Sequence, residues 1–153
     1  MLRVSAIAAL ALMLCDCEQG KRPFLMVQMC VQNNAGAAQL VGELKAVADS
    51  KGMEFTDNSA ETKRGLEAIG HPDRQRADGS PVINVGVLRE DGMGIGAGNL
   101  GLPGYQVALG FSEGSDKLEA RRFADEVIKR LEQHWRVETV PAGSGAMPKP
   151  DCK

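Results

Sequence analysis

Two amphipathic helical segments, each set between strand-like segments, constrain the fold of this chain most strongly. Residues 35–51 and residues 117–135 each place their apolar side chains on one stripe, so each helix needs a surface on which to bury that stripe. Asn33 or Asn34 is expected to cap the first helix, and Gly52 is expected to end it. The stripes are Ala37, Leu40, Val41, Leu44, Val47 and Ala48, then Ala120, Phe123, Ala124, Val127, Leu131 and Trp135.

A sheet is the expected partner of both helices, because the other segments alternate apolar and polar residues. The predicted strands are residues 24–32, 53–56, 81–89, 105–112 and 136–140, with a short helix over residues 57–69. Residues 91–104 hold six glycines that partly alternate with apolar residues, which predicts a further strand with one bare side.

The fold class that follows is α+β, for a single domain over residues 24–140. We expect a two-layer sandwich, with a mostly antiparallel sheet and two main helices on one face. The order of elements resembles an elaborated ferredoxin-like split βαβ fold, and this resemblance implies that the first strand is central.

The start of the chain has the features of an export signal. Arg3 supplies a positive charge, and residues 4–14 follow without any charge. This run is too short to span a bilayer as a helix, which needs about 20 residues. Residues 1–14 are therefore predicted to be a signal segment. The alternative is a buried N-terminal helix of the mature protein.

The residues that follow suggest a lipid anchor. Leu12-Met13-Leu14-Cys15 resembles the lipobox of bacterial lipoprotein precursors, although Leu14 stands where a small residue is usual. The resemblance covers the signal segment alone. It implies lipidation of Cys15, a tether over residues 15–23, and a membrane-anchored lipoprotein on the periplasmic side of a bacterial cell envelope.

The cysteines fit an exported protein, in which a disulfide is chemically permitted. If Cys15 carries lipid, then Cys17, Cys30 and Cys152 compete for one bond. We favour Cys30 with Cys152, because the Gly/Pro-rich tail over residues 141–153 is expected to fold back across the sheet. Cys17 with Cys152 is the rival pairing. The cysteine spacing does not suit zinc, and we predict neither a metal nor a cofactor.

One face of the predicted sheet carries small and amide side chains without formal charge. A face in water usually carries charged residues, and a face on a second core carries aliphatic ones. The face consists of Gln28, Cys30, Gln32, Asn84, Gly86, Gln106, Ala108, Gly110 and Ser112. Two compatible interpretations follow: the tail covers this face, or a partner protein docks on it.

The predicted partner-binding residues combine this face with the Gly-rich segment. Apolar residues in that segment are candidate anchors for an interface, or they pack against the edge of their own domain. The predicted set is Gln28, Gln32, Asn84, Gln106, Asn99, Leu100, Leu102 and Tyr105.

Ser112 is the catalytic candidate. Gly110-x-Ser112-x-Gly114 matches the nucleophile elbow and lies between a strand and a helix, so these five residues resemble the α/β-hydrolases. The helix length puts the downstream His134 about 25 Å away, and His71 is upstream. A strand-ending serine is the alternative. A match to the dinucleotide fingerprint at residues 96–101 does not open a helix and is set aside.

Charge and composition favour a binding protein over an enzyme. The net charge is −2, the charges on the last helix are mixed, and aromatic residues are scarce, so a nucleic-acid partner is not expected. Our leading hypothesis is a non-enzymatic protein-binding module whose partner is another envelope protein. An inhibitor, an immunity-type protein or an assembly accessory would fit. The alternatives are a small serine hydrolase using Ser112 and a structural lipoprotein without a dedicated ligand.

Overall fold

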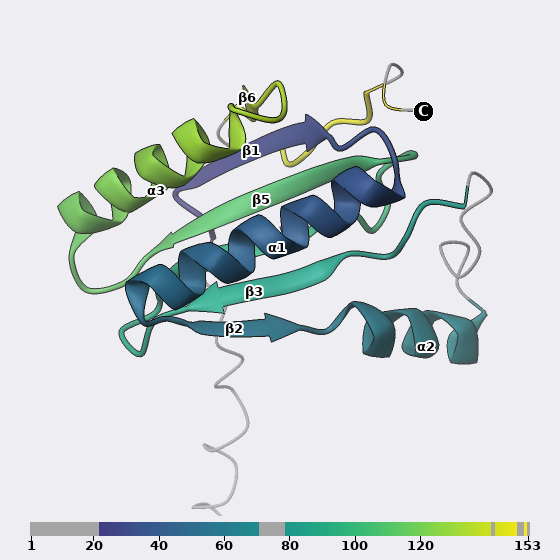
Figure 1. Cartoon of the computed structure of the whole chain (residues 1–153), viewed down its shortest axis with the longest axis horizontal. Helices are drawn as coiled ribbons and strands as arrows, with labels where there is room; N and C mark the ends of the chain where they lie inside the picture. Colours follow the sequence, from purple (N-terminus) through teal and green to yellow (C-terminus); the bar gives the residue numbers. More distant parts are fainter. Residues whose placement is uncertain (1–21, 71–78, 142, 150–151, 153) are drawn as a thin grey trace, which may run out of the picture.

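The computed structural model describes residues 22–70, 79–141, 143–149 and 152 (Figure 1). The predicted signal segment, Cys15, Cys17, most of the predicted tether and His71 lie outside the described residues. The elements are β1 (Leu25–Cys30), α1 (Asn34–Lys51), β2 (Glu54–Asp57), α2 (Ser59–Ile69), β3 (Asn84–Leu88), β4 (Met93–Gly98), β5 (Gln106–Glu113), α3 (Lys117–Leu131) and β6 (Glu138–Thr139).

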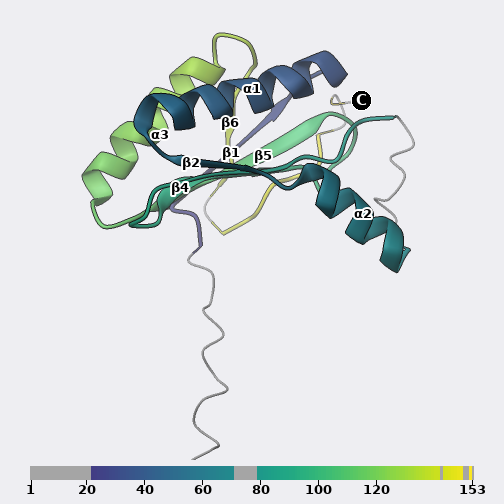
Figure 2. The same cartoon turned by 60° about the horizontal axis from the view of Figure 1, so that its bottom comes forward.

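The six strands form one antiparallel sheet in the order β2-β3-β4-β5-β1-β6. Helices α1 and α3 lie over the same face of this sheet (Figures 1 and 2). The predicted α+β sandwich is therefore confirmed. The chain passes from β1 to β2 through α1, and from β5 to β6 through α3. Three strands lie between β1 and β2, and one lies between β5 and β6, as in a split βαβ unit. Strand β1 lies inside the sheet, between β5 and β6.

The core fills the space between the sheet and the two helices. Both predicted stripes point into it, and only Val41 among their members remains partly exposed. In each of the four central strands, every second side chain points into the core. These core residues are Val27 and Met29 from β1, Val85 and Val87 from β3, Met93, Ile95 and Ala97 from β4, and Val107, Leu109 and Phe111 from β5. Burial of the apolar sides of helices and strands against each other is the main favourable term in this fold.

The helix ends follow the predicted capping pattern. The Asn33 side chain accepts a hydrogen bond from the Gly36 N–H at 2.8 Å, and Gly52 ends α1 with φ of 62°. Asp116 caps α3, since its carboxylate accepts the N–H groups of Leu118 and Glu119. These contacts satisfy backbone donors that the first turn of a helix leaves unpaired.

Several strands are shorter than predicted, and local hydrogen bonding explains two of them. Strand β3 begins at Asn84 because the Ile83 N–H is donated to the side chain of Asn99, at 2.8 Å. Strand β6 has only two residues. The Val140 N–H still donates to the Met26 carbonyl, but Pro141 comes next and has no N–H with which to continue the pairing. The Gly-rich segment does form a strand, β4, with its apolar side in the core.

Helix α2 stands apart from the other two helices, at the opposite side of the sheet (Figure 2). Leu66 is the one buried residue of α2. The Asn84 side chain holds the helix by donating to Thr62 Oγ1 at 2.8 Å. Among the described residues, no helix has the length and apolar character needed to cross a membrane.

A network of charges fastens the β3–β4 turn to the start of α3. Arg89 pairs with Asp91 and, through two hydrogen bonds, with Glu119. Asp91 also accepts the backbone N–H groups of Met93 and Ser115. The hydrogen bonds from Arg89, then from Ser115 and Met93, hold the pKa of Asp91 far below its ordinary value. The Arg89 guanidinium likewise lowers the pKa of Glu119.

Asp91→Asn is expected to flatten the acid dependence of stability. A carboxylate whose pKa falls on folding stabilises the folded state above its unfolded pKa, and this contribution is lost as the pH falls through the folded pKa. Wild-type stability should thus decline below about pH 4, more steeply than that of the variant. Urea unfolding across this range measures both slopes, with Asp125→Asn controlling for the loss of one negative charge. Equal slopes in all three proteins would contradict the assignment.

Candidate functional site

The sheet face that points away from α1 and α3 is the candidate site, and part of it is covered by the tail. We call residues 143–149 together with Cys152 the strap. Cys152 is disulfide-bonded to Cys30 of β1, with the two Cα atoms 5.4 Å apart. The predicted fold-back of the tail and the favoured disulfide pairing are both confirmed.

Two glutamine side chains hold the backbone of the strap. Gln106 donates to the Met147 carbonyl at 2.7 Å and accepts the Lys149 N–H at 2.7 Å. Gln28 accepts the Met147 N–H at 3.1 Å, and the Gln106 side chain also donates to Gln28, at 3.2 Å. Buried amides of this kind need hydrogen-bond partners, and the strap supplies them.

The strap changes the interpretation of the predicted amide face. Gln106 is completely buried and Gln28 is 9% exposed, so neither is open to a partner while the strap is in place. Gln32 is exposed, beyond the end of β1, with φ of 66°. The polar residues of the predicted partner-binding set therefore do not form one continuous exposed surface.

The remaining predicted residues also divide between internal and exposed positions. Asn84 bonds to α2, and Asn99 is 1% exposed, where it links Ile83 to the Pro81 carbonyl. These two amides serve the fold. Tyr105 packs against the core, whereas Leu100 is 45% exposed. Leu102 is half-buried. The structure thus leaves Leu100 as the most open of the predicted apolar anchors.

A bare strip remains on the same face beside the strap. Gly96 of β4 is directly opposite Gly86 of β3 and Gly110 of β5, so three glycines form a row across three strands. A Cβ atom built at Gly86 or Gly96 would meet nothing within 4 Å, and one at Gly110 would meet Pro23. We define the bare strip as Gly86, Gly96 and Gly98, together with Leu88 on the same side of β3, which is 52% exposed.

Ser112 lies at the end of β5, where its hydroxyl donates to the Gly92 carbonyl at 2.7 Å. His134 is the one histidine among the described residues, and it follows the far end of α3. Its contacts are with Glu43 and Trp135. Among the described residues, no hydrogen bond joins Ser112 to a basic side chain. The Ser112 hydroxyl instead ties β5 to the β3–β4 turn.

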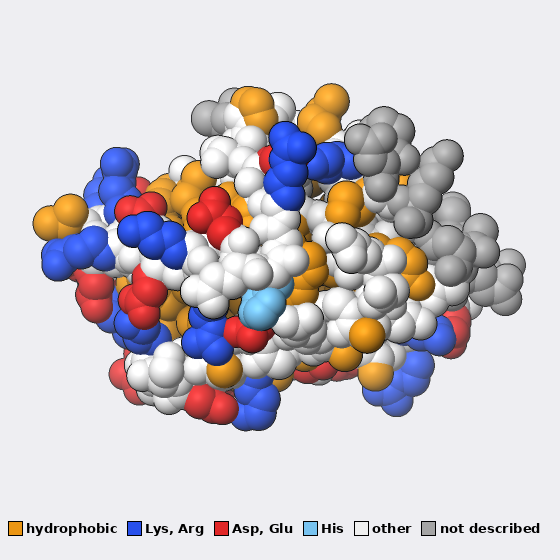
Figure 3. Space-filling view, turned by 45° about the horizontal axis from the view of Figure 1, so that its top comes forward, with side chains coloured by type: hydrophobic (Ala, Val, Ile, Leu, Met, Phe, Trp, Pro, Cys, Tyr) orange, Lys and Arg blue, Asp and Glu red, His pale blue; other side chains and the backbone are white. Residues whose placement is uncertain are grey.

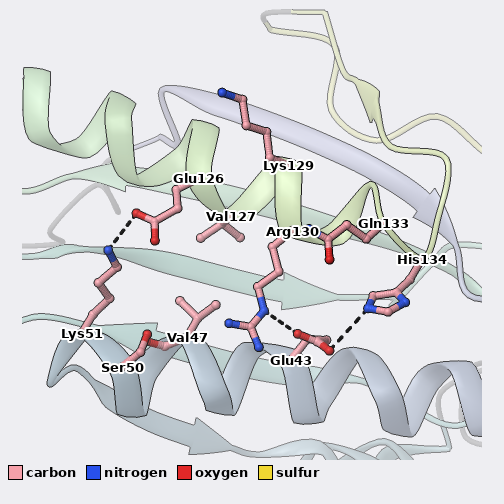
Figure 4. A pocket seen from close by; sticks show the side chains of 10 residues that line it. All are labelled: Glu43, Val47, Ser50, Lys51, Glu126, Val127, Lys129, Arg130, Gln133 and His134. Carbon is pink, nitrogen blue, oxygen red and sulfur yellow. Dashed lines mark hydrogen bonds and ion pairs between the residues drawn. The ribbon is translucent and has the colours of Figure 1, made fainter.

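A groove between α1 and α3 was not suggested by the sequence. Arg130 in the last turn of α3 and His134, which follows this helix, converge on Glu43 of α1, and Lys51 pairs with Glu126 at 2.7 Å (Figure 4). The groove has a volume of about 430 Å³ and a floor that includes Val47 and Val127. Glu43 and Arg130 are 87 residues apart, so no local pattern could have indicated their pairing.

Two ion pairs neutralise most of the charges in this groove, and Lys129 adds a further cation to its lining. On the helix side of the molecule, blue and red side chains mingle, and the histidine lies beside both (Figure 3). The Glu43–Arg130 and Lys51–Glu126 pairs each join α1 to α3, so they brace one helix against the other.

The described residues contain no cluster of three or more His, Cys, Asp or Glu side chains that could hold a metal. No protein-family model matches the chain, and no curated protein matches it in sequence.

Proposed function

We propose that this protein is an exported, lipid-anchored, non-enzymatic module that binds another protein of the bacterial envelope through the bare strip. The apolar run before Cys15 supports export and anchoring. The glycine row supports binding, because glycine inside a strand often marks the close approach of another backbone.

The single observation that carries the proposal is the empty space above Gly86 and Gly96. Nothing in the described fold requires glycine there, since an added Cβ would touch no atom within 4 Å. Glycine is also a poor strand former, because it loses more backbone freedom on folding than other residues. A partner lying flat on these strands would explain the choice. Leu88 and Met147, which are 52% and 58% exposed, would flank it as apolar contacts.

A crosslinking experiment with matched charge variants tests this proposal. A benzophenone amino acid at Leu88 would capture the partner in cells that make the protein. Gly96→Lys should abolish capture, because the long charged side chain would project from the bare strip and prevent the partner from lying against it. Gln39→Lys, which adds the same charge on the exposed side of α1, should leave capture unchanged. Capture that survives Gly96→Lys, or no captured protein at all, would overturn the proposal.

Gly96→Thr is expected to raise the free energy of unfolding by about 0.5–1 kcal/mol. The threonine side chain would enter open space and favours the extended backbone. Urea unfolding of the purified variant measures the change. A destabilised variant would mean that Gly96 has a role within the fold. That result would remove the argument that glycine at this position serves binding.

A further inference from the structure

The strap occupies its seat in the manner of a bound peptide. We define the seat as the side chains of Gln28, Gln106 and Glu138. The two amides contact the N–H and C=O of Met147 and the N–H of Lys149. In an extended peptide, the backbone N–H and C=O groups of every second residue point to the same side, so a binding site beside it contacts residues two positions apart. The seat therefore recognises an extended main chain, whatever the side chain at the position of Met147.

One side chain of the strap is nevertheless recognised. Lys149 Nζ lies 2.6 Å from Glu138 Oε1, and this contact is the first cause of the lowered pKa of Glu138. Met147 is 58% exposed, and Pro148 is also exposed, so neither is selected by the seat. The preferred ligand is thus an extended segment with a basic residue at the position of Lys149.

We propose that the seat is a second, redox-gated binding site, which accepts an extended basic segment of another polypeptide once the Cys30–Cys152 bond is reduced. The strap is then a built-in substitute for that segment. This site is separate from the bare strip, which is open while the disulfide is intact. The disulfide is the gate, because it adds a second covalent tether to the one that joins the strap to β6, and its reduction lowers the effective concentration of the strap at the seat.

The reductant is a dithiol, such as the active site of a thiol-disulfide oxidoreductase. Its thiolate attacks the sulfur of Cys30, because Cys30 is partly exposed whereas Cys152 is 2% exposed. Attack forms a mixed disulfide and releases the Cys152 thiolate, which takes up a proton. The second thiol of the dithiol then displaces Cys30. Two electrons and two protons pass to the cysteine pair, and the dithiol becomes a disulfide.

The test uses the full-length chain with its own strap weakened by Lys149→Glu and Cys152→Ser. The probe is a fluorescent peptide with the sequence of residues 143–153 carrying Cys152→Ser. Fluorescence anisotropy should show saturable binding to this variant and none to oxidised wild type. Adding Gln106→Leu to the variant should weaken binding about ten-fold or more, as should placing Lys149→Glu in the peptide.

The substitution in the peptide leaves the protein unchanged, so a folding defect cannot produce its effect. Equal binding of the two peptides would overturn the proposal, as would binding to oxidised wild type or no saturable binding at millimolar peptide. Hydrogen exchange of wild type gives a second measurement. Reduction should accelerate exchange at the amides of Met147 and Lys149, and unchanged exchange would rule out the gate. Neither result bears on capture at the bare strip, which uses oxidised protein.

Discussion

Cys152→Ala is expected to lower the free energy of unfolding by about 3–5 kcal/mol. The disulfide joins residues 122 positions apart, so its loss restores a large amount of freedom to the unfolded chain. The folded state should keep its sheet and helices, because the core cluster between them contains neither Cys30 nor Cys152. Urea unfolding of oxidised wild type and variant would measure the difference.

Two further variants sharpen this experiment. Cys30→Ala removes the same bond and should cost about as much as Cys152→Ala, and the double variant should cost little more than either, since residues that share one interaction are not additive. Cys17→Ala should leave stability unchanged, because Cys152 is bonded to Cys30. A large effect of Cys17→Ala would reinstate the rival pairing.

Gly36→Ala is expected to lower the free energy of unfolding by about 2–4 kcal/mol. A Cβ at Gly36 would clash with the Val31 carbonyl oxygen, which is a backbone atom just after the end of β1. The first turn of α1 would have to move away from β1, and the cap from Asn33 to the Gly36 N–H would be distorted. Thermal and urea unfolding would both report the loss.

Gly42→Ala is the matched control in the same helix. A Cβ at Gly42 would meet nothing within 4 Å, and Gly42 is exposed. Alanine there should raise stability by about 0.5–1 kcal/mol, through its higher helix propensity. The opposite signs of the two substitutions separate the close approach at Gly36 from the general effect of helical glycine. Similar effects at both positions would contradict the packing of α1 on β1.

The two proposed sites lie on the same face of the sheet and are open in different redox states of the Cys30–Cys152 pair. The bare strip is accessible in the oxidised protein, whereas the seat of the strap holds the protein's own tail through Cys152. A partner bound at the bare strip would lie beside the strap, whose Met147 is exposed. The crosslinking and peptide experiments can therefore succeed or fail independently.

The sequence by itself determined the layers of this fold. The helical stripes and the alternation in the strands depend only on side chains a few positions apart, so α1, α3 and the cores of β1, β3 and β5 could be predicted. Asn33 and Gly52 marked helix ends for the same reason. The tail and its disulfide could also be predicted, because an uncharged face needed a cover and carried Cys30.

Only the tertiary structure decided which residues meet across the sheet and between the helices. Strand register placed Gly96 between Gly86 and Gly110, and it depends on pairings that no single segment contains. Gln106 is buried beneath Met147 and is closed to a partner, whereas Gln32, a residue of the same type, is exposed. Local patterns state which side of an element is apolar, whereas the contacts that close a site are formed between elements distant in the chain.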